Sequence, residues 1–475
     1  MKYISTRDNS KEYSFEEVFI KGLADDGGLF IPREVKKYST EELESLSSLG
    51  YQDLAKKIIY PFIGDFMTIN ELSDIVDKSY SVFRKSNAVD LIKVGDTKLL
   101  ELFHGPTLAF KDIAMQLLGN FYEYYLQKNH KNINVIVATS GDTGAAAIDA
   151  IKGKKNINIF VLHPHNKISI VQRKLMSTVK ERNVFNIAIK GNFDDCQNLV
   201  KFMFSDKDFS NLINMSGVNS INWARIIAQA VYYFYTYFQI RDNRPVNFSV
   251  PTGNFGDVYA GYLAKKMGLP INKLIVATNQ NDILHRAISN GKYEAESVFE
   301  TNSPSMDIQI ASNFERLVYD LNDGDDNETQ KIMTSIKEDG KYIIPKNKME
   351  RINKDFLSAS MNEREVLDTI KEVYTKYAII LDPHSAIGFG ALNKVNINGN
   401  NIVLATAHPC KFPEAIDKSI AIKPSLPSEL QYIMDEKENY DIIANNLSKT
   451  KQYIKEKIQW NWRKTKTYLM LNFLF

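Results

Sequence analysis

The chain has 475 residues, of which 44% are hydrophobic and 24% charged, enough for two or three globular domains with a large core. Its 59 Lys and Arg against 57 Asp and Glu leave a net charge of +2, which gives no reason to expect nucleic acid or an anionic membrane as partner. The longest apolar run, at residues 468–475, is too short to span a bilayer.

Cysteine usage and the first residues indicate the compartment. Cys196 and Cys410 lie far apart, offer no zinc spacing and suit a reducing environment. Residues 1–14 are polar and charged, unlike a signal peptide. We therefore expect a cytoplasmic enzyme or binding protein without a metal site.

In chain order, the first ninety residues are acidic and polar, with helical stretches. The run GLADDGGLFIP (22–32) predicts a Gly-rich turn and a short strand that Pro32 stops. From about residue 95, apolar runs alternate with glycine loops and helix patterns, in the segments NINVIVATSGDTGAAAIDAIKG (132–153), PVNFSVPTGNFGDVYAGYLAKKMGLP (245–270), NKLIVATNQND (272–282), YAIILDPHSAIGFGAL (377–392) and NIVLATAHPCKFPEAI (401–416). This alternation predicts an α/β fold with parallel sheets buried on both faces. Ligands of such sheets bind at the carboxyl ends of the strands, where these loops fall.

Two further segments differ from this pattern. Residues 322–342 are polar and predict a surface excursion or a helical insert. The chain after residue 425 is rich in Lys and Asn and predicts helix.

HGPTLAFKD (104–112) places Lys111 in an otherwise apolar helix start. One interpretation is ordinary, because most helix lysines extend to water. The other is an amine with a lowered pKa, since burial and a helix N-terminus both disfavour the ammonium ion. A neutral amine can form a Schiff base with an aldehyde cofactor.

PTGNFGD (251–257) lies between a predicted strand and a predicted helix. Backbone amides at a helix N-terminus bind phosphate, and Gly253 and Gly256 would let the backbone approach it closely. The alternative is an ordinary turn between a strand and a helix.

TSGDTGA (139–145) is a second loop of this kind, with hydroxyls from Thr139, Ser140 and Thr143. Hydroxyl and amide donors together suit a small carboxylate. The alternative is a helix start capped by Ser140, Asp142 or Thr143.

NSINWARI (219–226) brings Asn219, Ser220 and Arg225 close together in sequence. Arg225 could form a bidentate contact with a phosphate or carboxylate, with Asn219 and Ser220 as further donors. The alternative is a helix N-terminus whose arginine pairs with a surface acid.

These segments, taken in order, resemble the threonine synthases, which are pyridoxal-phosphate enzymes of the tryptophan-synthase-β fold type (fold type II). The resemblance covers residues 1 to about 420 and rests on GLADDGGLFIP, HGPTLAFKD, TSGDTGAAA, GNFDDCQNLVK, NSINWARI, PTGNFGD, SPSMDIQIASNFERL, LDPHSAIG and TAHPCKFPEA. It implies an N-terminal threonine-synthase-type domain over residues 1–92. It further implies a catalytic α/β region over 93–425, with two subdomains and the site between them, followed by a helical tail over 426–475.

The resemblance also implies roles for the loop residues. Lys111 would carry pyridoxal 5′-phosphate as an internal aldimine, and Thr406 would face the pyridine nitrogen. A hydroxyl, unlike a carboxylate, does not enforce a protonated nitrogen. Asp142 stands where many relatives have an Asn near the ring hydroxyl. The remaining implied contacts are the cofactor phosphate on Gly253, Asn254, Phe255 and Gly256, the substrate carboxylate on Thr139, Ser140, Gly141 and Thr143, and the substrate phosphate on Asn219, Ser220 and Arg225.

The implied reaction converts O-phospho-L-homoserine and water to L-threonine and phosphate, in a monomer or homodimer. Two alternatives remain open: a phospho-lyase of the same family that releases 2-oxobutyrate and ammonia, and a non-catalytic protein that keeps the fold for binding. A nucleotide-dependent enzyme is disfavoured, because the chain lacks G-x-x-x-x-G-K-[ST] and GFGALN (388–393) departs from G-x-G-x-x-G at its last position.

Overall fold

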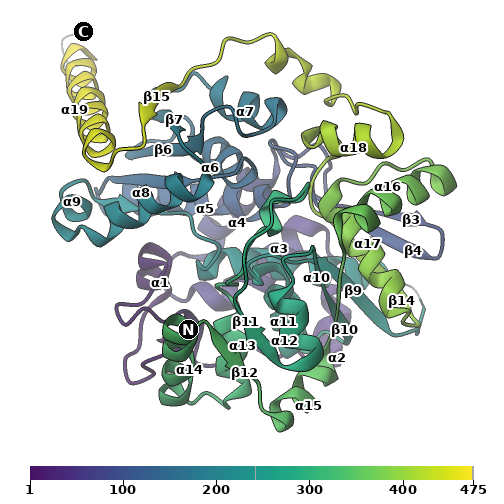
Figure 1. The fold of residues 1–475 in the computed structure, drawn as a ribbon. Helices are drawn as coiled ribbons and strands as arrows, with labels where there is room; N and C mark the ends of the chain where they lie inside the picture. Colours follow the sequence, from purple (N-terminus) through teal and green to yellow (C-terminus); the bar gives the residue numbers. More distant parts are fainter. Residues whose placement is uncertain (241, 473–475) are drawn as a thin grey trace. The chain divides into compact units, whose positions relative to one another are not determined.

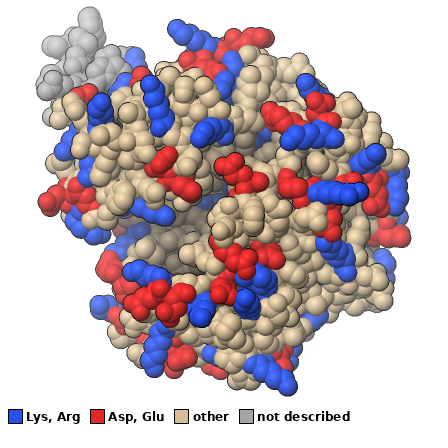
Figure 2. All heavy atoms as spheres, in the orientation of Figure 1, with Lys and Arg blue, Asp and Glu red and all other residues tan. Residues whose placement is uncertain are grey.

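The computed structural model describes residues 1–240 and 242–472, with side chains described as far as residue 459 (Figure 1). The chain forms two compact units: unit 1 comprises Met1–Ala114 and Asn219–Pro424, and unit 2 comprises Met115–Val218 and Ser425–Phe475. Within the described residues, no helix combines the length and the apolar character needed to cross a bilayer. The apolar run at residues 468–475 lies outside the described side chains. Acidic and basic side chains are interspersed on the face in Figure 2, in keeping with the near balance of charge.

Unit 1 is built on a six-stranded sheet in the order β13-β10-β9-β14-β4-β3. Five neighbouring strands are parallel, as the apolar runs predict, and β3 joins the edge antiparallel to β4. The strands are β3 (Asp90–Val94), β4 (Thr97–Glu101), β9 (Val246–Pro251), β10 (Ile271–Thr278), β13 (Phe356–Ser360) and β14 (Asn400–Ala405). Two short antiparallel pairs, β1 (Tyr3–Ser5) with β2 (Phe30–Pro32) and β11 (Lys292–Glu294) with β12 (Lys341–Ile343), complete the strands described in this unit.

The helices of unit 1 pack around this sheet, and α17 lies against β9, β10, β13 and β14. Helix α10 packs against both α11 and α3. The helices are α1 (Phe15–Lys21), α2 (Thr40–Leu46), α3 (Tyr51–Ile63), α4 (Ile69–Tyr80), α10 (Trp223–Phe238), α11 (Gly256–Lys266), α12 (Ile283–Asn290), α13 (Phe314–Leu321), α14 (Asp326–Asp339), α15 (Lys346–Asp355), α16 (Glu363–Tyr377), α17 (Pro383–Val395) and α18 (Pro413–Ile420), with 3₁₀ turns η1 (Pro304–Met306) and η2 (Pro409–Lys411). The polar segment 322–342 therefore contains a helix, α14.

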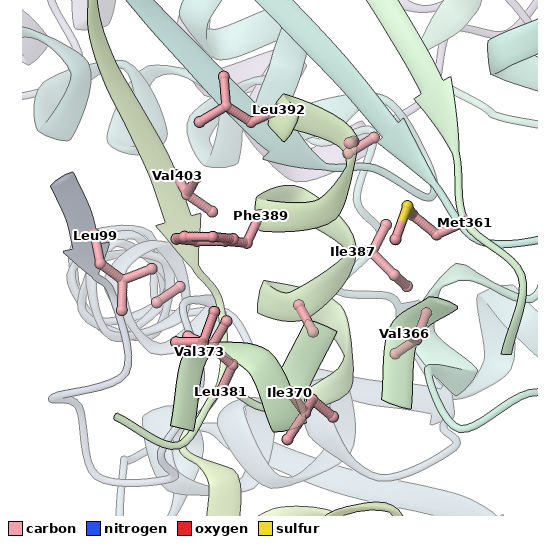
Figure 3. Packing of buried hydrophobic residues seen from close by; sticks show 14 of the residues in the cluster. Leu99, Met361, Val366, Ile370, Val373, Leu381, Ile387, Phe389, Leu392 and Val403 are labelled. Atoms are coloured by element: carbon pink, nitrogen blue, oxygen red, sulfur yellow. The ribbon is translucent and has the colours of Figure 1, made fainter. Parts of the chain in front are cut away.

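A buried apolar cluster between α16, α17 and the strands covers one face of the sheet (Figure 3). Phe389 of α17 lies beside Val403 of β14, and Val373 of α16 packs into the same cluster. Burying one such side chain contributes about 1.5–3 kcal/mol. The cluster therefore holds the start of α17 firmly against the carboxyl end of the sheet.

The structure corrects the element that the segment 377–392 predicts. Its apolar run Ile379–Leu381 predicts a strand by the same pattern as the other segments, but no strand forms there. Ala378, at φ +56°, ends α16 in the left-handed conformation, and Asp382 caps the N-terminus of α17. The run is a connection between two helices, and its apolar side chains pack against the cluster rather than entering the sheet.

Unit 2 has a five-stranded parallel sheet in the order β15-β7-β6-β5-β8. The segment after residue 425 supplies an edge strand as well as helix, so the expectation of helix alone was incomplete. The strands are β5 (Ile133–Ala138), β6 (Ile157–Pro164), β7 (Val184–Lys190), β8 (Met215–Ser216) and β15 (Asp441–Ala444); the helices are α6 (Asp142–Ile151), α7 (Ile170–Ser177), α8 (Phe193–Ser205), α9 (Lys207–Leu212) and α19 (Leu447–Asn472), with the 3₁₀ turn η3 (Ser428–Met434). Helix α5 (Lys111–Lys128) begins in unit 1 and continues into unit 2.

Candidate active site

The carboxyl edge of the sheet in unit 1 gathers three of the predicted loops. Strands β4, β14 and β9 are parallel neighbours, so their carboxyl ends lie at one edge. β4 leads toward Lys111, β14 leads into Thr406, and β9 leads into Gly253. The sheet therefore brings together loops that are up to three hundred residues apart in sequence.

Lys111 is held by the backbone on which it sits. Ala109 forms an isolated antiparallel bridge with Ala407, and the amide of Phe110 donates to the carbonyl oxygen of Thr406 at 2.8 Å. Lys111 follows as the first residue of α5. The predicted lysine and the predicted threonine are thus fixed beside each other by main-chain contacts.

The side chain of Lys111 is buried, with 9% of its surface exposed. Its Nζ lies 3.5 Å from the Oγ of Ser305 and 4.9 Å from the centroid of the Phe110 ring. The interpretation of Lys111 as an ordinary lysine that extends to water is therefore wrong.

The loop of residues 251–257 forms an open helix start. Phe255 is the N-cap residue of α11 at φ +64°, and no side chain among the described residues caps this terminus. A Cβ added at Gly253 would lie 2.8 Å from the carbonyl oxygen of Ser305, so only glycine fits there without a shift. The amides of this first turn are left for an anion, as the phosphate interpretation requires.

Asn313 joins this loop to the segment that contains Arg225. Its Nδ2 donates to the carbonyl oxygens of Asn254, at 3.0 Å, and Ser220, at 3.3 Å. The Oδ1 of Asn313 accepts from Arg316, a buried cation that also donates to the carbonyl oxygen of Phe30. The two predicted anion-binding segments therefore form one framework, to which the N-terminal block is attached.

Arg225 lies in the first turn of α10 and is 4% exposed. Burial lowers the pKa of its guanidinium to about 10. A buried cation is costly, and a bound anion would reduce that cost. Ser220 is half-buried and Asn219 is exposed. The interpretation of Arg225 as a surface arginine is wrong.

Asp257 is buried in the first turn of α11. One carboxylate oxygen accepts from the hydroxyls of Tyr232 and Tyr233, and the other is buried without a hydrogen-bond partner among the described residues. Burial raises the pKa of Asp257 to about 6, against the lowering effect of the two tyrosines and of Lys111. The carboxyl group thus keeps its proton more readily than an ordinary aspartic acid.

In unit 2, the loop of residues 139–145 is shaped by Thr139. Its Oγ1 accepts from the amides of Gly141 and Gly144, both at 2.9 Å. Gly141, at φ +138°, is the N-cap residue of α6, and Thr139 takes the capping role by accepting from the first-turn amide of Gly144. The prediction that Ser140, Asp142 or Thr143 caps the helix is therefore wrong, because Gly141 is the N-cap residue and Thr139 supplies the capping hydroxyl.

Asp142 has a defined partner in unit 2. Its Oδ1 accepts from the Nε2 of Gln172 at 3.0 Å, and both side chains are buried. A Cβ at Gly141 would lie 2.6 Å from the Gln172 side chain, so glycine is needed for this approach. Gln172 therefore fixes the orientation of the Asp142 carboxylate.

One group of described residues in unit 1 has the composition of a metal site: Asp90, Glu101 and His104, whose ligand atoms lie within 4.8 Å of one another. The Nε2 of His104 is 2.9 Å from Glu101, and Asp90 forms an ion pair with Lys85. Each of the three side chains therefore has a partner within the protein.

Comparison with known proteins decides the family. The model of the threonine synthase N terminus matches residues 2–80, that of pyridoxal-phosphate-dependent enzymes matches 99–406, and that of the threonine synthase C-terminal region matches 385–454. A threonine synthase of Pseudomonas aeruginosa is 42% identical over 461 residues, covering 96% of this chain and 98% of that protein. The chain belongs to the threonine synthase family. Threonine synthase structures agree: the pyridoxal-phosphate-bound enzyme of Brucella melitensis has a TM-score of 0.94 at 42% identity (96% of this chain and 99% of that one), and the yeast enzyme 0.93 at 41% (96% and 99%).

Pyridoxal 5′-phosphate is the cofactor, and the residues present fit it. The uncapped start of α11 offers amides to a phosphate, Gly253 keeps side chains out of the loop, and Lys111 supplies a buried amine. These features are what a threonine synthase needs to hold a phosphorylated aldehyde.

Sequence reasoning missed several residues of this threonine synthase site. Ser305 and Asn313 lie in SPSMDIQIASNFERL and Asp257 lies in PTGNFGD, segments that were used for the resemblance without a role for these residues. Gln172 carries no local signal, since only the fold brings it to Asp142.

Proposed function

We propose that the chain is a threonine synthase that eliminates phosphate from O-phospho-L-homoserine and adds water to give L-threonine. The observation that carries the proposal is the attachment of buried Lys111 to Thr406, at the same sheet edge as an uncapped helix start, which Asn313 joins to the segment that contains buried Arg225. A buried amine, a phosphate loop and a buried guanidinium match a phosphorylated cofactor and a phosphorylated substrate.

The cofactor is held by residues of unit 1. Lys111 would hold its aldehyde through Nζ, the amides of Gly253 to Gly256, including those of Asn254 and Phe255, would bind its phosphate, and the hydroxyl of Thr406 would serve the pyridine nitrogen. When bound, pyridoxal phosphate draws electrons from the substrate carbon that carries the amino group. Support comes from the backbone link between Lys111 and Thr406 and from the open first turn of α11.

The substrate is held at its two ionic ends. Arg225, with Ser220 and Asn219 beside it, binds the phosphate, because a buried guanidinium gains most from an anion that can accept two hydrogen bonds. In unit 2, the loop containing Thr139, Ser140, Gly141 and Thr143 binds the carboxylate through hydroxyl and amide donors, and Thr139 shapes this loop by accepting from the amides of Gly141 and Gly144. Asp142, oriented by Gln172, serves the cofactor's ring hydroxyl.

Lys111 carries out the first proton transfer. Its Nζ removes the proton from the α-carbon and returns a proton to the substrate later in the reaction. The burial of Lys111 keeps its Nζ away from bulk water, so that the amine exchanges protons with the substrate rather than with solvent. Arg225 holds the phosphate as it leaves the γ-carbon.

We further propose that the protein acts in the cytoplasm on small molecules. Two free cysteines support this compartment. Residues 1–92 form the N-terminal region, 93–425 the catalytic region and 426–475 the tail, a division supported by the family match over 2–80.

The test combines a product assay with a covalent label. Purified protein incubated with O-phospho-L-homoserine should release threonine and phosphate in equal amounts. Borohydride reduction followed by peptide mass spectrometry should find the cofactor on Lys111. Lys111→Ala should lose the label and the turnover, whereas Lys394→Ala, at an exposed lysine, should keep both.

Three results would contradict the proposal. Formation of 2-oxobutyrate and ammonia as the main products would identify a phospho-lyase. Cofactor binding without turnover would identify a binding protein. Turnover by Lys111→Ala at the normal rate would remove the assignment of this lysine.

A further inference from the structure

A histidine in the first turn of α17 has one ring nitrogen hydrogen-bonded and, within the described part of the chain, no hydrogen bond on the other nitrogen. His384 is 4% exposed, and its Nδ1 lies 2.9 Å from the Oδ1 of Asp382. Its Nε2 is buried with no hydrogen-bond partner among the described residues. The ring also packs against that of Phe412, with 4.8 Å between the ring centroids.

The contacts of Asp382 determine which ring nitrogen of His384 carries a hydrogen. Asp382 also accepts from the backbone amides of His384, at 3.0 Å, and Ser385, at 3.2 Å, and from the hydroxyl of Ser385. A carboxylate surrounded by donors acts only as an acceptor, so the Nδ1 of His384 carries a hydrogen. The Nε2 of the neutral ring then presents a lone pair, and Asp382 would stabilise the ring if it gained a proton there.

Two sets of interactions connect His384 to residues next to Lys111. The Oγ of Ser385 accepts from the amide of Thr406 at 3.1 Å, and the carbonyl oxygen of Thr406 accepts from the residue that precedes Lys111. On the other side, His384 lies within electrostatic reach of Asp307, two residues after Ser305, whose Oγ is near the Nζ of Lys111.

A buried nitrogen without a partner lowers stability unless a ligand or water meets it. The proposed reaction needs several proton transfers at different carbons, and only Lys111 has so far been given that role. The hydroxyl group of threonine must come from water, and a base beside that water would speed its addition.

We propose that His384 is a further catalytic residue: the base that activates the water added to the substrate, an inference that rests on the proposed function. The water oxygen forms a bond to the β-carbon while one of its O–H bonds breaks. The proton goes to the Nε2 of His384, and the electron pair of the β-carbon's double bond moves to the α-carbon, which later takes a proton from Lys111. The imidazolium is stabilised by Asp382 and passes its proton to the released phosphate.

The experiment compares His384→Gln and His384→Ala with wild-type holoenzyme. His285→Gln is the matched control, because His285 also has a bonded Nδ1, 2.9 Å from the hydroxyl of Ser358. For the His384 variants, kcat for threonine should fall on the order of 10²–10⁴-fold, with little change in KM. The share of substrate released as 2-oxobutyrate should rise, because the dephosphorylated substrate leaves before water adds. The borohydride label on Lys111 should remain.

Several results would overturn the inference. One is a His384→Gln variant that keeps the wild-type threonine rate. Another is a variant that slows but keeps the wild-type ratio of threonine to 2-oxobutyrate, because a base for water must change that ratio; such a result would leave the released phosphate as the base. If the wild-type chain makes no threonine, the proposed function itself fails, and this is seen before any variant is measured.

Discussion

Replacing Asp257 by Asn should change how the stability of the protein depends on pH. Burial raises the pKa of this carboxyl group from an ordinary value of 3.8 to about 6. The folded state therefore binds a proton that the unfolded state releases, and the free energy of unfolding falls as pH rises from about 4 to about 6. The difference between the two pKa values corresponds to about 3 kcal/mol, all of it lost above about pH 6.

Asn removes this ionisation and keeps most of the geometry. Its Oδ1 can still accept from Tyr232 and Tyr233, and its Nδ2 takes the place of the oxygen that has no partner. Relative to the wild type, the free energy of unfolding of Asp257→Asn should rise by about 2 kcal/mol as the pH rises from about 4.5 to about 8. The two unfolding free energies should converge at the acidic end, where Asp257 is protonated in both states.

The assay is urea unfolding of cofactor-free protein at several pH values. Asp242→Asn is a control of opposite sign, because Arg244 holds the pKa of the exposed Asp242 below its usual range. That carboxylate contributes stability that is lost as pH falls. If the difference between Asp257→Asn and wild type were the same at every pH, the reasoning about the buried carboxyl group would be refuted.

Three further substitutions test the site. Arg225→Met should raise KM for O-phospho-L-homoserine on the order of 10²-fold, measured by phosphate release, because the proposed contact between the buried guanidinium and the substrate phosphate would be lost. An unchanged KM would remove the arginine from substrate binding. Gly253→Ala should weaken cofactor binding about tenfold or more in a spectrophotometric titration, because its Cβ would meet a carbonyl oxygen at 2.8 Å. Gly50→Ala, where the nearest atom is 3.9 Å away, should bind normally. Arg316→Met should cost about 3–5 kcal/mol in urea unfolding, because it leaves buried carbonyl oxygens unpaired, whereas Arg364→Met should cost little, because among the described residues the exposed Arg364 pairs only with Asp368 on its own helix. A loss as small for Arg316 as for Arg364 would contradict this reasoning.

Much of the sheet edge could be predicted from the sequence. Apolar runs followed by glycine loops identify strand ends, and parallel strands bring those ends together, so the loops of Gly253 and Thr406 could be placed at such an edge from the sequence. The segment of Lys111 predicted only a helix start, because the strand β4 before it was not recognised. The run at Ile379–Leu381 misled this reasoning because its apolar side chains pack against the sheet from a connection between two helices. Composition alone does not separate that case from a strand.

The partners of the site residues could not be predicted in the same way. Asn313 serves the site through a side-chain contact with the backbone of Ser220, ninety-three residues earlier. His384 was noticed only as part of a motif, because its unpartnered nitrogen is a property of the folded environment. Contacts of this kind depend on tertiary packing, which a single sequence does not display.

The guanidinium of Arg316 has a consequence for the order in which the protein matures. It binds the carbonyl oxygen of Phe30 across 286 residues of chain, and it also binds the side chain of Asn313, on which the phosphate loop rests. Contacts between distant residues form slowly, because a long loop must close first. On the ribosome, the N-terminal block is made early but must wait for residue 316 before its strand β2 gains this contact. Competence for the cofactor is therefore a late event in folding, and a nascent chain halted before residue 316 should not yet bind it.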